Sequence, residues 1–128
     1  MITTGGLGPT QDDITRQVVA NALDLELIKN KEALKEIRSY FQDMGREMTD
    51  NNIQQAFLPQ GSQIVINNNG TAPGFLVDTG ETIVISVPGV PLEMKSMISD
   101  FLIPYLKDNK LEDQVIQETI EGKEVDIP

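Results

Sequence analysis

A glycine-rich loop followed by two acidic residues is the segment of this sequence best suited to chemistry. Residues 5–13 read GGLGPTQDD and follow the end of an expected strand. Glycine allows positive φ angles and a close approach of the main chain to a ligand, and the start of the helix expected after the loop would favour a phosphate. The segment lacks the G-K-[ST] ending of a Walker A loop and does not match G-x-G-x-x-G. The segment therefore predicts an anion-binding loop that belongs to neither of these two motif types.

The two acids have both a functional and a structural interpretation. Asp12 and Asp13 are expected in the first helical turn, where they could hold Mg²⁺ against a pyrophosphate, because Mg²⁺ takes one or two carboxylates with phosphate oxygens. However, Thr10 and Asp13 also have the spacing of a capping box, and acids in a first turn stabilise a helix by about 0.3–1 kcal/mol without any function. We interpret Asp12 and Asp13 as candidate catalytic residues and metal ligands. The candidate phosphate contacts of this segment are Gly5, Gly6, Gly8 and Thr10.

A second turn resembles the first in its position. The apolar residues 83–87 predict a buried strand, and Pro88 and Gly89 lead from it into another helix. Ligands of open α/β sheets bind beyond the carboxyl ends of the strands, so we expect both turns to face one crevice. Glu93 suits the positive end of the second helix, although a stiff turn with a structural Glu93 explains the pattern as well. Pro88, Gly89 and Glu93 are candidate ligand contacts.

Residues 67–74 (NNNGTAPG) form a loop of small residues and free amides. Such a loop allows close backbone approach to a ligand, but it equally describes an ordinary surface loop. Gly70, Thr71 and Gly74 are its candidate ligand contacts. Three further candidates for phosphate or ribose contacts stand elsewhere, each with a solvated surface side chain as the alternative. They are Arg46, Asn52 and Lys95, the last also a candidate catalytic cation.

Composition limits the chemistry that these segments can perform. The chain has 128 residues, a net charge of −10, and no Cys or His. The charge argues against nucleic-acid polymers and anionic membranes as partners, because both need a basic surface. Catalysis would have to use carboxylates, hard metals such as Mg²⁺, backbone amides and a few Lys or Arg side chains. Since no apolar run approaches the ~20 residues of a membrane helix, we expect a soluble, cytoplasmic protein.

The elements that position these segments alternate between strands and helices. A helix is predicted over residues 11–23, with Ile14, Val18 and Ala22 facing the core. Asn30 is expected to cap a second helix that ends near Gly45.

The second half of the chain is richer in strand patterns. Thr49 is expected to cap a short helix that extends through Phe57. Strands are predicted at 64–66, 75–78 and 82–87, the last two as a hairpin, and Pro104 should kink or end the final helix. We therefore predict an α/β layered domain with a partly parallel sheet and a small hairpin. It would cover residues 1–107, followed by an acidic tail, 108–128, that forms a weak hairpin (115–120 with 123–127) or is mobile.

Four segments, in order, resemble one known family. They are residues 3–13, 46–52 (REMTDNN), 70–75 (GTAPGF) and 88–95 (PGVPLEMK). Together they resemble the amino-terminal domain of the competence/damage-inducible protein A family, which has the molybdopterin-binding (MoaB/Mog-like) fold. The resemblance extends over residues 2–106.

The resemblance implies a Rossmann-like domain that binds a phosphorylated nucleotide or pterin, with metal-dependent ADP-ribose pyrophosphatase activity. The nicotinamide mononucleotide deamidase domain of many members has no match here. Family members also begin with strand–helix units upstream, so we expect a fold that is incomplete at its amino terminus and an open sheet edge. Such an edge favours a homo-oligomer. The alternatives to the enzyme are a non-catalytic nucleotide- or molybdopterin-binding module and an inactive, oligomerising fragment.

Overall fold

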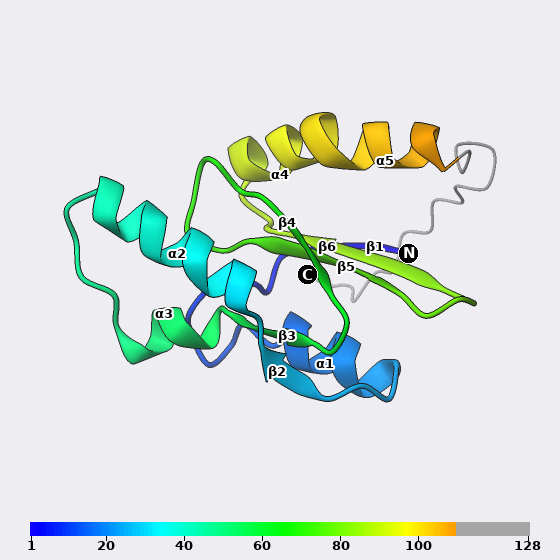
Figure 1. Ribbon diagram of the computed structural model, residues 1–128, viewed down its shortest axis with the longest axis horizontal. Coiled ribbons are helices and arrows are strands. Elements are labelled where there is room, and N and C mark those ends of the chain that lie inside the picture. The colour runs from blue at the N-terminus through cyan, green and yellow to red at the C-terminus, as the bar shows by residue number, and fades with distance from the viewer. Residues whose placement is uncertain (110–128) are drawn as a thin grey trace.

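A four-stranded sheet forms the centre of the fold (Figure 1). The computed structural model describes residues 1–109. β1 (Ile2–Thr4) pairs in parallel with β6 (Ile83–Val87), while β5 (Gly74–Asp78) runs antiparallel to both β6 and β4 (Gln63–Val65). The strand order is β1-β6-β5-β4. This arrangement confirms the predicted α/β class with a partly parallel sheet and a hairpin.

One face of the sheet is covered by three helices and a two-stranded ribbon (Figure 1). The helices are α1 (Thr15–Ala22), α2 (Lys31–Asp43) and α3 (Asp50–Gln54). In the ribbon, β2 (Leu27–Lys29) pairs antiparallel with β3 (Phe57–Pro59).

The opposite face is covered by one continuous helical segment. It comprises α4 (Pro91–Met97), a π-helical turn η1 (Ile98–Leu102) and α5 (Ile103–Asp108). Of the two effects predicted for Pro104, a kink or the end of the helix, the second is wrong, because the helical segment continues through Pro104 to Asp108. The proline ring clashes with the carbonyl four residues earlier, and the wider π turn before Pro104 provides room for it.

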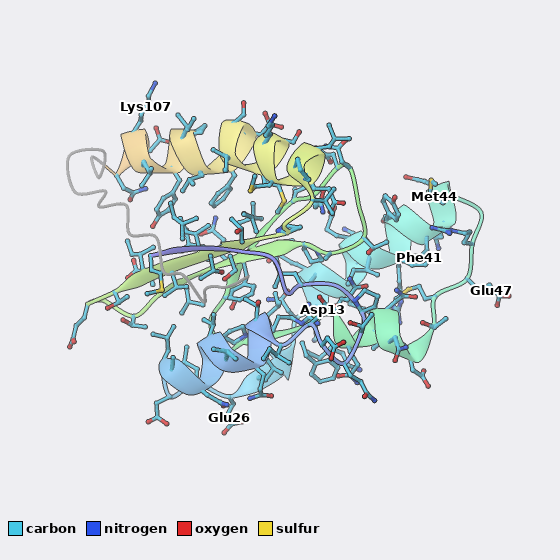
Figure 2. The ribbon with its side chains drawn as sticks, turned by 180° about the vertical axis from the view of Figure 1, so that it is seen from behind. Asp13, Glu26, Phe41, Met44, Glu47 and Lys107 are labelled. Carbon is cyan, nitrogen blue, oxygen red and sulfur yellow. The ribbon has the colours of Figure 1, made fainter. Side chains whose placement is uncertain are left out.

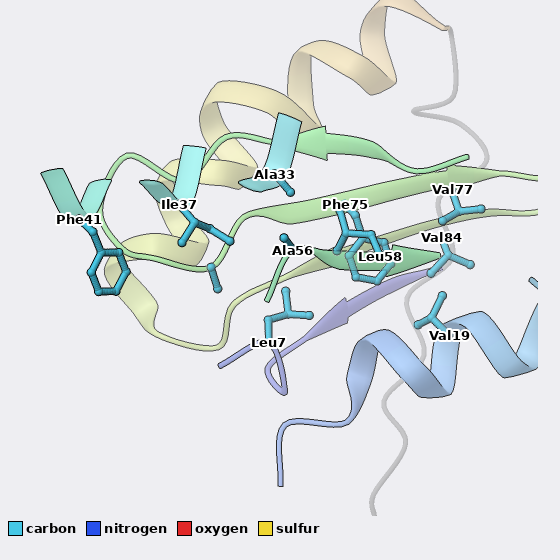
Figure 3. Close-up of a cluster of buried hydrophobic side chains, with 11 residues drawn as sticks. Leu7, Val19, Ala33, Ile37, Phe41, Ala56, Leu58, Phe75, Val77 and Val84 are labelled. Atoms are coloured by element: carbon cyan, nitrogen blue, oxygen red, sulfur yellow. The ribbon is translucent and has the colours of Figure 1, made fainter. Parts of the chain in front are cut away.

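Each long strand contributes to two hydrophobic cores because alternate side chains point to opposite faces. Phe75, Val77 and Val84 belong to the core shared with α1, α2 and β3 (Figure 3). Leu76 and Ile85 pack instead beneath α4, η1 and α5. The buried Ser86 hydroxyl accepts a hydrogen bond from the Thr3 hydroxyl at 2.7 Å, so this polar group is paired.

The prediction for α1 is wrong in its start and in its buried face. Residues 10–13 form a separate turn, and the helix begins only at Thr15. Ile14 and Val18 are 57% and 51% exposed, whereas Arg16 and Val19 are each 7% exposed. Residues 16, 19, 20 and 23 have helical spacing too, but a pattern search on apolar residues passes over a buried arginine.

The other helix predictions hold, with one further correction. Asn30 caps α2 by accepting a hydrogen bond from the Ala33 amide, and Gly45 follows the helix with a φ of +66°. Thr49 caps α3 as expected, but Phe57 lies in β3 rather than in the helix. Pairing with β2 accounts for this change, because Phe57 stands opposite Lys29.

Within residues 1–109, no helix combines the length and the apolar character that crossing a bilayer requires. The predicted hairpin over 115–120 and 123–127 lies outside the described residues.

The buried face of α1 can be tested with two adjacent valines. Val19→Ala is expected to lower the free energy of unfolding by about 2 kcal/mol, because each buried CH₂ contributes about 0.8 kcal/mol and a cavity adds to the loss. Val18→Ala makes the same chemical change on the exposed face and should stay within about 0.5 kcal/mol of the wild type. Urea denaturation of both variants measures the difference. Equal losses would contradict the orientation of α1.

Candidate functional site

The glycine loop bends sharply where β1 ends. Gly5 and Gly6 have φ angles of +90° and +71°, which L side chains rarely adopt. The loop is fastened on both sides: the Gly5 amide donates to the Val87 carbonyl at 2.9 Å, and the Thr15 hydroxyl donates to the Gly5 carbonyl at 2.8 Å. A Cβ on Gly6 would overlap the Thr15 hydroxyl. The loop therefore has one shape, set by β6 and by the start of α1.

The turn after β6 lies directly against this loop. A Cβ on Gly89 would stand 3.2 Å from the Gly5 Cα. Because β1 and β6 are parallel, their carboxyl ends lie at the same edge of the sheet. The prediction that both turns face one crevice is confirmed.

The crevice is a cleft of about 470 Å³. Three loops meet around it: the glycine loop, the turn after β6 and the loop between β4 and β5. Figure 2 shows Asp13 in the connection between β1 and α1. The lining residues are Gly5, Gly6, Leu7, Gly8, Asp13, Gln55, Thr71, Ala72, Pro88, Gly89, Val90 and Glu93. A second hollow, of about 340 Å³, is lined only by residues of α2.

The structure brings together about half of the predicted site residues. Eight of them line the cleft: Gly5, Gly6, Gly8, Asp13, Thr71, Pro88, Gly89 and Glu93. The other predicted residues are not among those that line it: Thr10, Asp12, Arg46, Asn52, Gly70, Gly74 and Lys95.

Asp13 belongs to a turn of its own rather than to a helical turn. Its Oδ2 accepts from the Thr10 amide at 3.0 Å and from the Thr10 hydroxyl at 2.7 Å. The Thr10 hydroxyl is the main reason why the pKa of Asp13 lies below its ordinary value; partial burial opposes this, and the Thr10 and Gly8 amides and the Arg16 charge add to it. Asp13 is thus an ionised carboxylate at neutral pH, while its neighbour Asp12 is exposed.

Glu93 is held by the loop between β4 and β5. Its Oε1 accepts from the Asn67 Nδ2 at 2.7 Å, and the same Nδ2 donates to the Ala72 carbonyl at 2.9 Å. A Cβ on Gly70 would collide with the Glu93 carboxylate. Gly70 therefore makes room for Glu93 from outside the cleft lining.

Three of the other predicted residues, Arg46, Lys95 and Gly74, lie outside the cleft lining. Arg46 lies over the Phe41 ring, 5.9 Å from its centroid. Lys95 is exposed on α4. A Cβ on Gly74 would stand 2.5 Å from the Ser86 carbonyl oxygen, so glycine here permits strand β5 to approach β6. The buried Gln55, not the predicted Asn52, reaches the cleft from the α3 region.

Arg16 is a site residue that the sequence analysis missed. The side chain is buried behind the glycine loop, where Nη1 donates to the Leu7 carbonyl at 2.7 Å and Nη2 to the Gly8 carbonyl at 3.0 Å. Burial lowers the pKa of Arg16 and the Asp13 charge raises it, yet a guanidinium remains protonated in proteins. Arg16 thereby fixes two carbonyls of the loop and places a positive charge near Asp13.

The cleft offers oxygen ligands of the kind that Mg²⁺ prefers. Asp13 and Glu93 are the two carboxylates in its lining. Among residues 1–109, no three Asp, Glu, His or Cys side chains gather into a metal-binding group. The residues therefore fit a hard divalent ion that a ligand's phosphate oxygens help to hold, since Mg²⁺ is usually bound by one or two carboxylates with phosphates and water. They do not provide a metal site made of protein ligands alone.

The fold and the cleft define an α/β domain with a ligand site at the carboxyl ends of parallel strands. Residues 1–108 match the family described as "Probable molybdopterin binding domain". The chain belongs to this family, and the predicted resemblance to competence/damage-inducible protein A is confirmed by its relatives.

These relatives are considerably longer than the region that they share with this chain. A protein of Acetivibrio thermocellus, named as a competence-damage inducible protein, is 48% identical over 108 residues, which is 84% of this chain and 26% of that protein. A CinA-like protein of Dictyoglomus thermophilum is 43% identical over 106 residues, 83% of this chain and again 26% of the relative. The chain thus spans about a quarter of the length of these curated relatives.

A solved structure shares the fold. The crystal structure of the protein CinA from Thermoplasma acidophilum, described as of unknown function, is 30% identical to this chain, with a TM-score of 0.70. The similarity covers 84% of this chain and 60% of that one.

The role of Arg16 can be measured as stability. Arg16→Met keeps an apolar stem but removes the donors to the Leu7 and Gly8 carbonyls, which leaves Gln55 as the remaining side-chain donor to the Leu7 carbonyl. A hydrogen bond to a charged group contributes about 1.5–3 kcal/mol. We expect a loss of about 2 kcal/mol in the free energy of unfolding by urea. Arg38→Met, on the exposed side of α2, is the control and should change stability by less than about 0.5 kcal/mol. Similar losses in both variants would show that the loop does not depend on Arg16.

The Asp13 turn predicts a pH dependence. A carboxyl whose pKa is lower in the folded chain than in the unfolded chain contributes stability above its unfolded pKa, and this contribution is lost as the pH falls through the folded pKa. The stability advantage of the wild type over Asp13→Asn should therefore be present at about pH 6 and disappear below about pH 4. Denaturation across this range measures it, with Asp12→Asn as the neighbouring control. An advantage that is unchanged at low pH would contradict the Thr10–Asp13 contact.

Proposed function

We propose that the cleft binds a phosphate-bearing nucleotide or pterin together with a divalent cation such as Mg²⁺. The observation that carries the proposal is the meeting of glycine main chain and two carboxylates, Asp13 and Glu93, in one cleft. Glycine main chain permits close approach of a phosphate group. The two carboxylates would repel that same phosphate unless a cation neutralised part of the charge.

The residues that line the cleft support a role for the cation. No lysine or arginine is among the lining residues that the structure describes. The positive charge of Arg16 is directed at loop carbonyls behind the cleft. A diphosphate entering without a cation would therefore meet two negative side chains and no facing positive one. Asp13 and Glu93 would hold the cation, which neutralises phosphate charge and polarises a phosphoryl oxygen when bound.

Hydrolysis of ADP-ribose is the more specific form of the proposal, and it is supported by the family resemblance. Water would bond to one phosphorus while the bridging P–O bond breaks, which gives AMP and ribose 5-phosphate. The proton of the attacking water would pass to a cleft carboxylate or to solvent. In this reaction the glycine loop would orient the diphosphate, and Asp13 and Glu93 would hold the cation.

Binding without turnover is the second candidate, and the positions of two basic side chains favour it. Lys95 and Arg46, the residues predicted to offset charge during cleavage, do not line the cleft. A molybdopterin- or nucleotide-binding module needs neither of them. The predicted homo-oligomer is compatible with both functions. β1 lies at one edge of the sheet described, where a strand of a second copy could pair with it.

Calorimetric titration with ADP-ribose, in Mg²⁺ and in EDTA, separates these functions. We expect binding in Mg²⁺ and at least a 10-fold weaker Kd in EDTA, which corresponds to about 1.4 kcal/mol. Asp13→Asn and Glu93→Gln should each weaken binding in Mg²⁺ by a similar factor, whereas Asp12→Asn should bind like the wild type. Chromatography of the mixture then tests for AMP.

Each outcome has a distinct meaning. AMP formed only with Mg²⁺ supports the hydrolase, and binding without AMP supports the module. Binding that is unaffected by EDTA would overturn the role of the cation. If the chain binds neither ADP-ribose nor a pterin phosphate in Mg²⁺, the proposed function is wrong.

A further inference from the structure

A buried glutamine connects two of the loops that form the cleft. Gln55 follows α3 and is 1% exposed. Its Nε2 donates to the Leu7 carbonyl of the glycine loop at 3.3 Å and to the Thr71 Oγ1 at 3.3 Å. These two acceptors belong to loops that are far apart in the sequence. The Gln55 side chain therefore hydrogen-bonds to both loops at once.

The orientation of the Gln55 amide is determined by a chain of hydrogen bonds. The Thr49 backbone N–H can only donate, and it donates to the Asn52 Oδ1 at 3.0 Å. The Asn52 Nδ2 must then point the other way, where it donates to the Gln55 Oε1 at 3.2 Å. With its oxygen engaged, Gln55 presents its NH₂ group to Leu7 and Thr71. This chain also gives a role to Asn52, which the sequence singled out but which does not line the cleft.

The contact with Thr71 has a chemical consequence. A hydroxyl has one hydrogen to donate and two lone pairs that accept. The Thr71 oxygen accepts from Gln55, so its hydrogen stays available to donate to another group. Because Thr71 lines the cleft, that hydrogen can reach an oxygen of a bound phosphate or ribose.

We propose that Gln55 is a positioning residue, which sets the distance between the glycine loop and Thr71 and directs the Thr71 hydroxyl toward the ligand. The part of this inference that concerns the ligand rests on the proposed function. The part that concerns the two loops does not, since it follows from the hydrogen bonds alone. Arg16 also holds the Leu7 carbonyl, so the glycine loop keeps one anchor when Gln55 is changed.

Gln55→Glu tests the inference with almost no change in shape. A protonated carboxyl keeps the acceptor and one of the two donors, so it can still donate to the Leu7 carbonyl, whereas a carboxylate would face that carbonyl with no donor. Burial favours the neutral form and raises the pKa of a carboxyl. The variant should therefore keep the contact with the Leu7 carbonyl at low pH and lose it as the pH rises. Gln54→Glu is the matched control, because Gln54 is the exposed neighbour at the end of the same helix.

The first measurement needs no ligand. The Gly8 amide shares its peptide group with the Leu7 carbonyl, so its NMR resonance reports on that carbonyl. Between about pH 5 and about pH 8, a range above the ordinary carboxyl pKa because burial raises it, the Gly8 and Thr71 amide resonances of Gln55→Glu should shift with one common midpoint. They should not do so in the wild type or in Gln54→Glu. The absence of such a shift would overturn the inference whatever the ligand.

The second measurement is binding of ADP-ribose with Mg²⁺ over the same pH range. Gln55→Glu should bind at least 10-fold more weakly at the high end than at the low end, relative to the wild type, while Gln54→Glu should follow the wild type. A resonance shift without this loss of affinity would overturn the positioning role. If the wild type itself does not bind the probe but the resonances shift, the proposed function fails while the connection between the loops stands.

A second pair of variants covers the case in which Gln55→Glu does not fold. Asn52→Leu removes the group that orients the Gln55 amide, and Asn51→Leu makes the same change at an exposed position of α3. We expect the first to move the Gly8 and Thr71 resonances and to weaken binding severalfold, and the second to do neither. Identical spectra for both variants would contradict the orientation of Gln55.

Discussion

The parallel pairing of β1 with β6 is the constraint on which the site depends. Two parallel strands end at the same edge of a sheet, so the chain must turn twice at one place. Hydrogen bonding from the Gly5 amide to the Val87 carbonyl continues this pairing one residue beyond the strands. The contact between Gly5 and Gly89 then follows from the spacing of adjacent strands. An antiparallel pairing would have placed the two turns at opposite ends of the sheet.

Charge is the second constraint, and it explains why the site would need a cation. The chain has a net charge of −10, and the described cleft lining adds two carboxylates without a lysine or arginine. Arg16, whose side chain contacts this lining at Leu7 and Gly8, uses its donors on their carbonyls. The buried guanidinium of Arg16 thus stabilises the shape of the loop. In the proposed function, an ion that arrives with the ligand would neutralise its phosphate.

Much of the fold was predictable from the sequence because it depends on local patterns. The hairpin of β5 and β6 follows from two apolar runs around a turn, and α2 follows from Asn30 at one end and Gly45 at the other. The glycine loop and the Pro88–Gly89 turn were also identifiable, since strand, turn and helix follow each other directly. The errors occurred where distant contacts decide. The buried face of α1 depends on Arg16 meeting the carbonyls of a loop, and no apolar period reports this.

The site was predictable to the extent that its residues lie in the turns themselves. Gly5, Gly89 and Glu93 line the cleft as a consequence of the strand order. Gln55 was missed because it is one of two adjacent glutamines at the end of a short helix, and its contacts depend on two loops outside that segment. Arg46 and Lys95 were chosen for their charge, but charge does not indicate direction. Arg46 lies over the Phe41 ring, and Lys95 is exposed on α4.

Leu7 gives the cleft a property that its glycines alone would not provide. This side chain is 1% exposed and belongs to the same hydrophobic core as Ile37 and Phe75 (Figure 3). To swing open, the loop would have to pull an apolar side chain into water, at a cost of roughly 1.5–3 kcal/mol. The empty and filled forms of the cleft should therefore differ little in backbone conformation. A ligand that fits would lose conformational entropy on binding, whereas the ordered loop of the protein would lose very little.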